Sequence, residues 1–131
     1  MEILRCELNK RLMLGMFFFE AHFAHYPKGA YYKRHCDSFR GAKNRIISTV
    51  LYLNSDWKKE NGGLLAMYRD EDATEPFATI TPHIGNFVLF LSEGIPHEVL
   101  TAHAPRASIA GWFRCNDKTQ APALQAPVIT P

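Results

Sequence analysis

The stretch FATITPHIGNFVLFLSEGIPHEVLTAHAPRASIAGWFR, residues 77–114, contains four short apolar runs interrupted by residues that favour turns. The runs are FATITP, NFVLFLS, HEVL and ASIAGWFR, and the interruptions include Pro82, Gly85, the Gly94-Ile95-Pro96 triplet and Pro105. Short runs of this kind, rich in β-branched and aromatic residues and bounded by Gly or Pro, predict β-strands. The second half of the chain is therefore expected to be a series of short strands.

The preceding segments continue this pattern toward the N-terminus. Residues 45–54, RIISTVLYLN, are dense in β-branched residues, and LLAMY follows a polar loop that closes on Gly62-Gly63. Residues 16–26 are rich in aromatic side chains and end before Pro27, as a strand entering a turn would. Leucines recur every four residues at 4, 8 and 12, which predicts a short amphipathic helix over residues 2–14 that stops at Gly15. One helix followed by many short strands indicates a sandwich or a small barrel.

Length and composition limit the classes of protein. The chain has 131 residues, 47% of them hydrophobic, and a formal net charge of +2. This is the size of one globular domain, and the near balance of charge gives no reason to expect nucleic acid or a membrane surface as a partner. The longest apolar run, which Glu20 interrupts, is too short to span a bilayer. We expect one domain over residues 1–118, followed by a Pro- and Ala-rich tail at 119–131.

The N-terminus and the cysteines bear on the cellular compartment. Charged residues run through the first fourteen positions, so this segment does not resemble a signal peptide. The three cysteines, Cys6, Cys36 and Cys115, form no CxxC pair, and their odd number argues against a disulfide framework. The simplest prediction is a protein of the reducing cytoplasm.

His35 and Asp37 stand two positions apart, with Cys36 between them. At the end of a strand, residues two apart point to the same side, so both side chains would point inward and Cys36 away. His97, far along the chain, could supply a third ligand. Two histidines and one carboxylate are the ligand set of non-haem Fe(II) oxygenases, but zinc accepts the same three ligands. The ligands alone leave the metal open.

Arg106 and Ser108 bear on that choice, because they share one face of the predicted strand ASIAGWFR. A buried arginine is costly unless it meets an anion, and its planar guanidinium matches a carboxylate in a bidentate way. A dicarboxylate co-substrate would satisfy both demands, with one end on iron and the other on Arg106. 2-Oxoglutarate is such a molecule.

The order His35-x-Asp37, His97, Arg106-x-Ser108 resembles the signature of Fe(II)/2-oxoglutarate-dependent dioxygenases. Five blocks resemble the prolyl 4-hydroxylase branch of that family, and bacterial prolyl hydroxylases of the oxygen-sensor type in particular: AHYPKGAYYKRHCD, TVLYLNSDW, ENGGLLAMY, PHEV and PRASIAGWF. The similarity extends over residues 19–114. It implies a mainly β fold, a double-stranded β-helix (jelly-roll) barrel with one short N-terminal helix.

The resemblance also implies roles for individual residues. His35, Asp37 and His97 would be the iron ligands. The 2-oxoglutarate site would consist of Arg106 on the distal carboxylate, Tyr52 and Ser108 as further donors, and Tyr26 near the iron-binding end. Trp112 and Tyr32 would help to wall the pocket, and Arg45 falls where the family contacts its substrate.

The activity that the resemblance implies is hydroxylation of a prolyl residue in a protein, with release of succinate and CO2. Elongation factor Tu is a candidate substrate by analogy with bacterial relatives. Fe(II), 2-oxoglutarate and O2 would be required, and ascorbate would support turnover. Two alternatives remain: the same chemistry on a free amino acid or another small molecule, and a cupin-like jelly roll that binds metal without catalysis.

One feature departs from the family. Its members carry helices before the barrel that cover the larger sheet, whereas one short helix precedes the barrel here. We therefore expect either a truncated or short form of the enzyme or a homo-oligomer in which another subunit covers an exposed apolar sheet.

Overall fold

The computed structural model describes residues 1–38 and 44–115. The elements along the chain are α1 (Glu2–Leu12), β1 (Phe18–Tyr26), β2 (Tyr32–His35), β3 (Arg45–Tyr52), a 3-10 turn (Lys59–Asn61), β4 (Leu65–Met67), β5 (Ala78–Ile80), β6 (Phe87–Leu91), β7 (His97–Val99) and β8 (Arg106–Arg114). The described part is mainly β with one α-helix, as the apolar runs predicted. The predicted tail at 119–131 lies outside the described residues.

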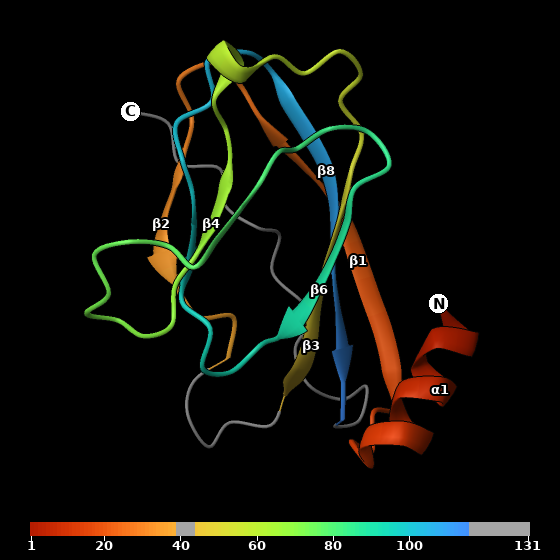
Figure 1. Cartoon of the computed structure of the whole chain (residues 1–131). Helices are drawn as coiled ribbons and strands as arrows, with labels where there is room; N and C mark the ends of the chain where they lie inside the picture. The colour runs from red at the N-terminus through yellow and green to blue at the C-terminus, as the bar shows by residue number, and fades with distance from the viewer. Residues whose placement is uncertain (39–43, 116–131) are drawn as a thin grey trace.

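The strands form two four-stranded sheets, with the orders β1-β8-β3-β6 and β2-β7-β4-β5 (Figure 1). Every pairing within them is antiparallel. Successive strands alternate between the two sheets, except for the β4–β5 hairpin, which stays in the second sheet. This strand order is that of the predicted double-stranded β-helix.

The core between the sheets explains why the chain alternates in this way. Ala24, Tyr26 and Phe90 from the first sheet pack in one cluster with Leu65, Met67 and Val99 from the second. Residues two apart on a strand share a face, so each sheet contributes every second side chain to this cluster. The same alternation places Arg106 and Ser108 on the inner face of β8, where both are buried.

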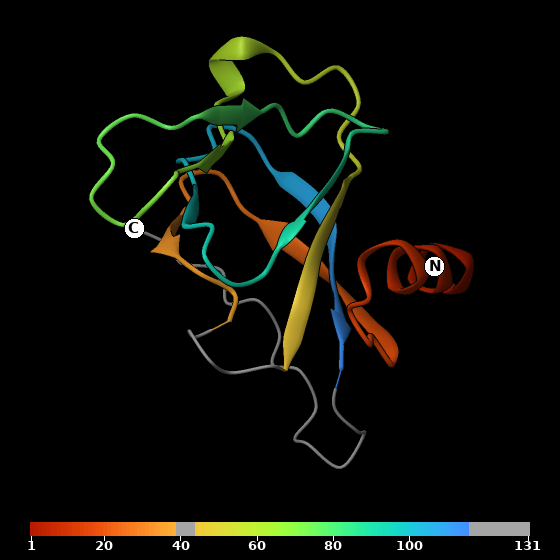
Figure 2. The same cartoon turned by 60° about the horizontal axis from the view of Figure 1, so that its bottom comes forward.

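The helix α1 lies beside β1, outside the two sheets (Figure 2). Leu4 and Leu8 pack onto a second apolar cluster, as the four-residue spacing predicted. The prediction was wrong at the C-terminal end: the helix ends at Leu12, because Met13 adopts a left-handed conformation (φ 54°) and donates its N–H to Asn9 O. The Leu12 side chain stays 55% exposed. No helix in the described ranges is long and apolar enough to cross a membrane.

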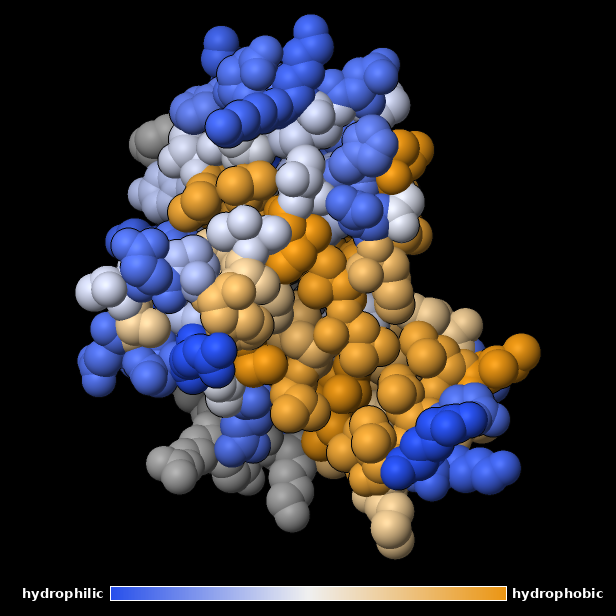
Figure 3. Space-filling view, viewed as in Figure 1, coloured by the Kyte–Doolittle hydropathy of each residue, from blue (hydrophilic) through white to orange (hydrophobic). Residues whose placement is uncertain are grey.

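The outer side of the sheet β1-β8-β3-β6 is apolar, and α1 covers only part of it. We call this surface the outer apolar face; its exposed members are Phe23, Phe87, Leu89 and Leu91. The strand register places Phe23, Ile109, Leu51 and Phe87 in one row across the four strands. Figure 3 shows a broad hydrophobic surface that extends from beside α1 across this side of the molecule. The described residues thus include an apolar sheet surface that is exposed to solvent.

Candidate metal centre and anion pocket

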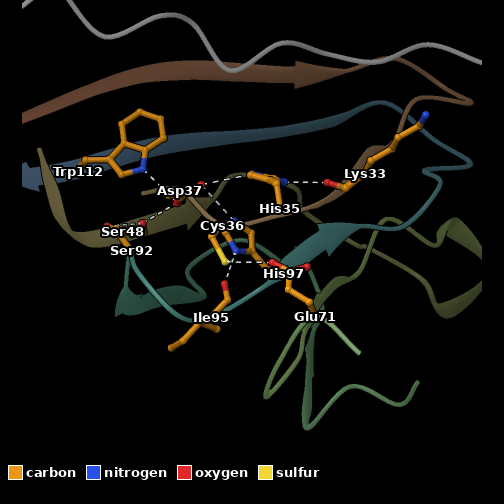
Figure 4. A network of polar contacts seen from close by, with 10 residues as sticks. All are labelled: Lys33, His35, Cys36, Asp37, Ser48, Glu71, Ser92, Ile95, His97 and Trp112. Atoms are coloured by element: carbon orange, nitrogen blue, oxygen red, sulfur yellow. Dashed lines mark hydrogen bonds and ion pairs between the residues drawn. The ribbon is translucent and has the colours of Figure 1, made fainter. Parts of the chain in front are cut away.

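The three predicted metal ligands lie together at one end of the second sheet (Figure 4). His35 closes β2 directly opposite His97 at the start of β7, and Asp37 follows two residues after His35. The Nε2 atoms of both histidines are 3.3 Å from Asp37 Oδ1. If one ligand atom is taken from each of the three residues, these atoms all lie within 4.8 Å of one another. The antiparallel pairing of β2 with β7 therefore brings distant parts of the sequence to one point.

Backbone carbonyls orient the two histidine rings. His35 Nδ1 lies 2.7 Å from Lys33 O, and His97 Nδ1 lies 3.0 Å from Ile95 O. A ring nitrogen that faces a carbonyl carries the proton, so the other nitrogen of a neutral ring is free to bind a metal. Both Nε2 atoms consequently point at the shared centre.

Asp37 is held from the opposite side by side chains of the first sheet. Its Oδ2 accepts a hydrogen bond of 2.5 Å from Ser48 Oγ and one of 3.1 Å from the Trp112 indole N–H. Ser48 Oγ is also 2.8 Å from Ser92 Oγ, so Ser92 donates to Ser48 while Ser48 donates to Asp37. With Oδ2 engaged, Oδ1 is the oxygen presented to a cation.

Charge in the cluster favours a cation as well. Burial alone would raise the pKa of Asp37, but hydrogen bonds from His35 and His97, the charge of His97 and the bond from Ser48 hold that pKa well below its usual value. Burial lowers the pKa of His97, yet its hydrogen bond and charge interaction with Asp37 outweigh burial and raise it. An ionised carboxylate and two imidazole nitrogens are suitable ligands for a divalent metal. The metal would replace the proton that His97 shares with Asp37.

The anion pocket is built around Arg106, whose side chain is only 2% exposed. Its Nε donates to Gly63 O at 2.8 Å, and Nη2 lies 3.4 Å from the Tyr52 hydroxyl. The rings of Tyr26 and Tyr52 each lie 5.0 Å from the guanidinium carbon. In the described part of the chain no carboxylate forms an ion pair with Arg106. A buried cation with only neutral neighbours fits an anionic ligand.

The two tyrosines are suited to donate hydrogen bonds there. Burial raises the pKa of Tyr26 to about 12, although the charge of Arg106 acts in the opposite direction. Burial also raises the pKa of Tyr52 against the same opposing charge. Both phenols therefore keep their protons at neutral pH. Ser108, two residues after Arg106 on the same face, is buried beside Ala24 and Tyr52 in the strand register.

Glycine is required where the loop before β4 meets Arg106. Gly63 has φ +66°, and a Cβ there would lie 3.0 Å from Arg106 Cδ and 3.2 Å from the Trp57 ring. Both the backbone conformation and the close approach disfavour a larger side chain. In the sequence the Gly62-Gly63 pair indicates only a loop, and the contact with Arg106 leaves no signal there.

The predicted pocket residues lie beside the metal centre. Tyr32 stacks on His35 with ring centroids 4.1 Å apart, and the Arg45 guanidinium lies 3.9 Å from the Trp112 ring centroid. Tyr32, His35 and Arg45 line an open groove of about 1090 Å³. We refer to it as the groove. Trp112 was predicted only as a wall, but its indole also holds Asp37.

Sequence reasoning missed the residues that support the ligands. Ser48 shares a strand face with Tyr52, so the two-residue period places it inside, but nothing in its type indicated a bond to Asp37. Ser92 and the carbonyls of Lys33 and Ile95 left no signal, because their partners are set by strand register and backbone path.

A jelly roll that places two histidines and a carboxylate beside a buried arginine has the features of a non-haem iron protein that binds an anionic co-substrate. The family model described as the 2OG-Fe(II) oxygenase superfamily matches residues 21–114, and the chain belongs to this family. The family prediction is confirmed, and Fe(II) and 2-oxoglutarate are the metal and the co-substrate after which this family is named.

Several relatives are prolyl hydroxylases. Human Egl nine homolog 1 is 37% identical over 91 residues, which are 67% of this chain and 21% of the relative. The crystal structure of a Pseudomonas putida prolyl-4-hydroxylase is 46% identical, with a TM-score of 0.80, covering 88% of this chain and 63% of that one. A Trichoplax adhaerens prolyl hydroxylase, in complex with a peptide from hypoxia inducible factor, is 30% identical with a TM-score of 0.75, covering 86% and 52%. The chain spans less than two thirds of each of these relatives.

Proposed function

We propose that this chain is an Fe(II)- and 2-oxoglutarate-dependent dioxygenase that hydroxylates a prolyl residue in a protein. One C–H bond of the substrate, O2 and 2-oxoglutarate would give the C–OH product, succinate and CO2. The observation that carries the proposal is the buried, carboxylate-free Arg106 in the same inter-sheet space as the two-histidine, one-carboxylate cluster. A metal-binding jelly roll without this co-substrate has no need of such a cation.

The residues present fit both groups. His35 and His97 through Nε2, and Asp37 through Oδ1, would hold Fe(II). Arg106, with Tyr52 and Ser108, would hold the distal carboxylate of 2-oxoglutarate. Tyr26, which interacts electrostatically with both Arg106 and Asp37, would lie near the iron-binding end. When bound, the iron and its co-substrate supply the oxidising power for C–H hydroxylation, and ascorbate would keep the iron reduced.

The chain's own contribution is orientation and exclusion of water. Ser48 and Trp112 fix Asp37 so that one oxygen faces the centre. Gly63 and Tyr52 fix the guanidinium before any ligand arrives, which lowers the ordering cost of binding. The burial that raises the tyrosine pKa values also keeps water from competing for Arg106. No side chain is assigned as a general base.

A protein substrate is supported by the groove and by the relatives. The groove opens beside His35 and carries Arg45 and Tyr32, whose side chains could contact an extended peptide. The Pseudomonas relative is described as a prolyl-4-hydroxylase, and the Trichoplax relative was solved with a peptide. By analogy with bacterial relatives, elongation factor Tu is the substrate that we propose.

Two further parts of the proposal concern the surroundings of the protein. We infer a cytoplasmic location, which is consistent with Cys6, Cys36 and Cys115 forming no disulfide. We also infer self-association through the outer apolar face, since exposed apolar patches of this kind mark association surfaces.

The test is incubation of the chain with Fe(II), 2-oxoglutarate, O2 and purified elongation factor Tu, followed by peptide mass spectrometry. We expect a mass gain of one oxygen atom on a proline, absent with Arg106→Ala. Succinate release that is stimulated by free proline and not by the protein favours the small-molecule alternative. Iron binding without succinate release under any condition favours the cupin-like alternative.

A further inference from the structure

One wall of the groove is formed by the segment between β4 and β5, residues 68–77, which we call the β4–β5 loop. Arg69, Asp70 and Glu71 of this loop line the groove, as do His35 and Cys36. The loop is exposed over most of its length, and its base is closed by the bond from Phe77 N to Met67 O. Loops with few bonds to the rest of a protein open at little cost in free energy. Such a loop can form a stable wall of the groove only if contacts with the rest of the protein hold it in place.

Arg34, the residue before His35, makes such contacts. Its Nη1 donates to two carbonyls of the loop, Glu71 O at 3.2 Å and Ala73 O at 2.8 Å. Its guanidinium lies over the Tyr68 ring, 3.4 Å from the centroid. In the described part of the chain, no other side chain from outside the loop donates a hydrogen bond to the loop backbone.

The same guanidinium also connects the loop to the second metal-ligand strand. Arg34 Nη2 lies 3.6 Å from Glu98 Oε2, and the Tyr68 hydroxyl donates to that oxygen at 2.6 Å. Glu98 directly follows His97. The loop is thereby attached to both strands that carry histidine ligands, and a sulfur contact of 3.7 Å from Cys36 Sγ to Glu71 Oε1 adds to this attachment (Figure 4).

The chemistry of arginine matters for this arrangement. An ion pair at this degree of exposure contributes little by itself, in the range of about 0–1 kcal/mol. A planar guanidinium, however, can stack on Tyr68, bond two carbonyls and meet Glu98 at the same time. Lysine has a single ammonium group without a plane to stack, so it cannot make all of these contacts together.

We propose that Arg34 is a positioning residue that holds the β4–β5 loop as a wall of the substrate groove. It sets the affinity for a protein substrate, and it leaves the affinities for iron and 2-oxoglutarate unchanged. This inference rests on the proposed function, because it assigns the groove to the substrate. All of the contacts named for Arg34 run to the loop and to Glu98, and none runs to Asp37 or Arg106.

The first measurement is hydrogen exchange of the full chain under anaerobic conditions with Fe(II) and 2-oxoglutarate bound. In Arg34→Ala the amides of residues 69–76 should exchange about tenfold faster or more, a change of ~1.4 kcal/mol in opening free energy, while those of β8 stay unchanged. Arg34→Lys should restore only part of the protection. Arg11→Ala, on the exposed side of α1, is the matched control and should behave as wild type.

The second measurement separates substrate binding from chemistry. With elongation factor Tu as the probe, Arg34→Ala should raise KM for the protein about tenfold, the effect of losing ~1.4 kcal/mol of binding. The kcat and the KM for 2-oxoglutarate should stay at their wild-type values. Unchanged loop exchange overturns the proposal, and so does faster exchange with an unchanged protein KM. If the wild type does not modify this protein, the proposed substrate fails, and loop exchange alone decides whether Arg34 holds the wall.

Discussion

The inner face of the sheet β1-β8-β3-β6 holds buried polar side chains beside its apolar core, whereas the outer face leaves apolar side chains exposed. The inner face carries buried polar and charged side chains, among them Arg106, Ser48 and Arg114. The outer face carries exposed apolar ones, with Phe23 75% and Leu91 51% accessible. In an ordinary half-buried sheet the apolar residues face inward and the polar ones face water.

The difference shows what each face is built for. Burying a polar group is costly unless it is partnered, and the inner groups have partners: Gly63 O for Arg106, Asp37 for Ser48 and Glu20 for Arg114. The polar side chains of the inner face therefore include those that form the anion pocket and support the metal centre. The outer face has no comparable network of bonds, and its exposed apolar area fits an association surface. Four substitutions test whether the two faces differ in this way.

The largest effect is expected for a metal ligand on the inner side. Asp37→Ala removes the oxygen that meets both histidines and the acceptor of the bonds from Ser48 and Trp112. Loss of a group that only supports a ligand costs roughly 10–100-fold in metal affinity, so loss of the ligand should exceed this range. Anaerobic Fe(II) titration of the folded variant checks it. If iron affinity falls by no more than roughly 10–100-fold, as it would for a supporting residue, Asp37 is not a ligand.

Arg106→Ala comes next and acts on the co-substrate alone. Truncating one partner of a buried, hydrogen-bonded charge pair costs about 2–5 kcal/mol, which corresponds to at least ~30-fold in affinity. Calorimetric titration with 2-oxoglutarate in the presence of Fe(II) measures the loss. Iron affinity serves as the internal control and should not change. A wild-type affinity for 2-oxoglutarate would contradict the assigned role of Arg106.

A smaller effect is expected at Gly63, for which the chain offers a matched control. Gly63 and Gly85 both have positive φ, +66° and +89°, so alanine strains the backbone at each by about 1–2 kcal/mol. Only at Gly63 would the new methyl group meet Arg106; at Gly85 nothing lies within 4 Å. Gly63→Ala should therefore weaken 2-oxoglutarate binding about tenfold, or by ~1.4 kcal/mol, whereas Gly85→Ala should only lower the melting temperature. Equal binding losses in both variants would refute a specific role for this contact.

The smallest effect on the site is expected from the outer face. Phe23→Ser should leave iron and 2-oxoglutarate affinities unchanged, because Phe23 points away from the inter-sheet space. It should shift the sedimentation of the protein toward smaller species if the outer apolar face joins subunits. Phe77→Ser, at another exposed phenylalanine, controls for general solubility. Identical sedimentation of wild type and Phe23→Ser would argue against association through this face.

Part of the ligand set could be predicted from local spacing, because His35 and Asp37 stand two apart and their side chains point to the same side. His97 lies far along the chain, and its place in the set came from the resemblance to the dioxygenase signature. Arg106 was predictable for a physical reason: an inward arginine on an apolar strand requires an anion. The fold class followed from the short apolar runs and their turn residues.

The supporting shell could not be predicted in the same way. The bond from Ser48 to Asp37 depends on how β3 aligns with β8, which places Ser48 beside Trp112. The bonds of Arg34 depend on the path of a loop more than thirty residues away along the chain. The end of α1 was misplaced because the left-handed conformation occurs at Met13, a residue type that rarely signals it, before Gly15 is reached.

We expect the space between the two sheets to hold Fe(II) and 2-oxoglutarate together. The most direct test is anaerobic titration of the protein with Fe(II) and then with 2-oxoglutarate, while the visible metal-to-ligand charge-transfer absorption is recorded. We expect the band to develop only when both are present, and we expect Arg106→Ala to shift its half-saturation to a higher 2-oxoglutarate concentration. A folded protein that binds iron and yet develops no band at saturating 2-oxoglutarate would contradict this expectation.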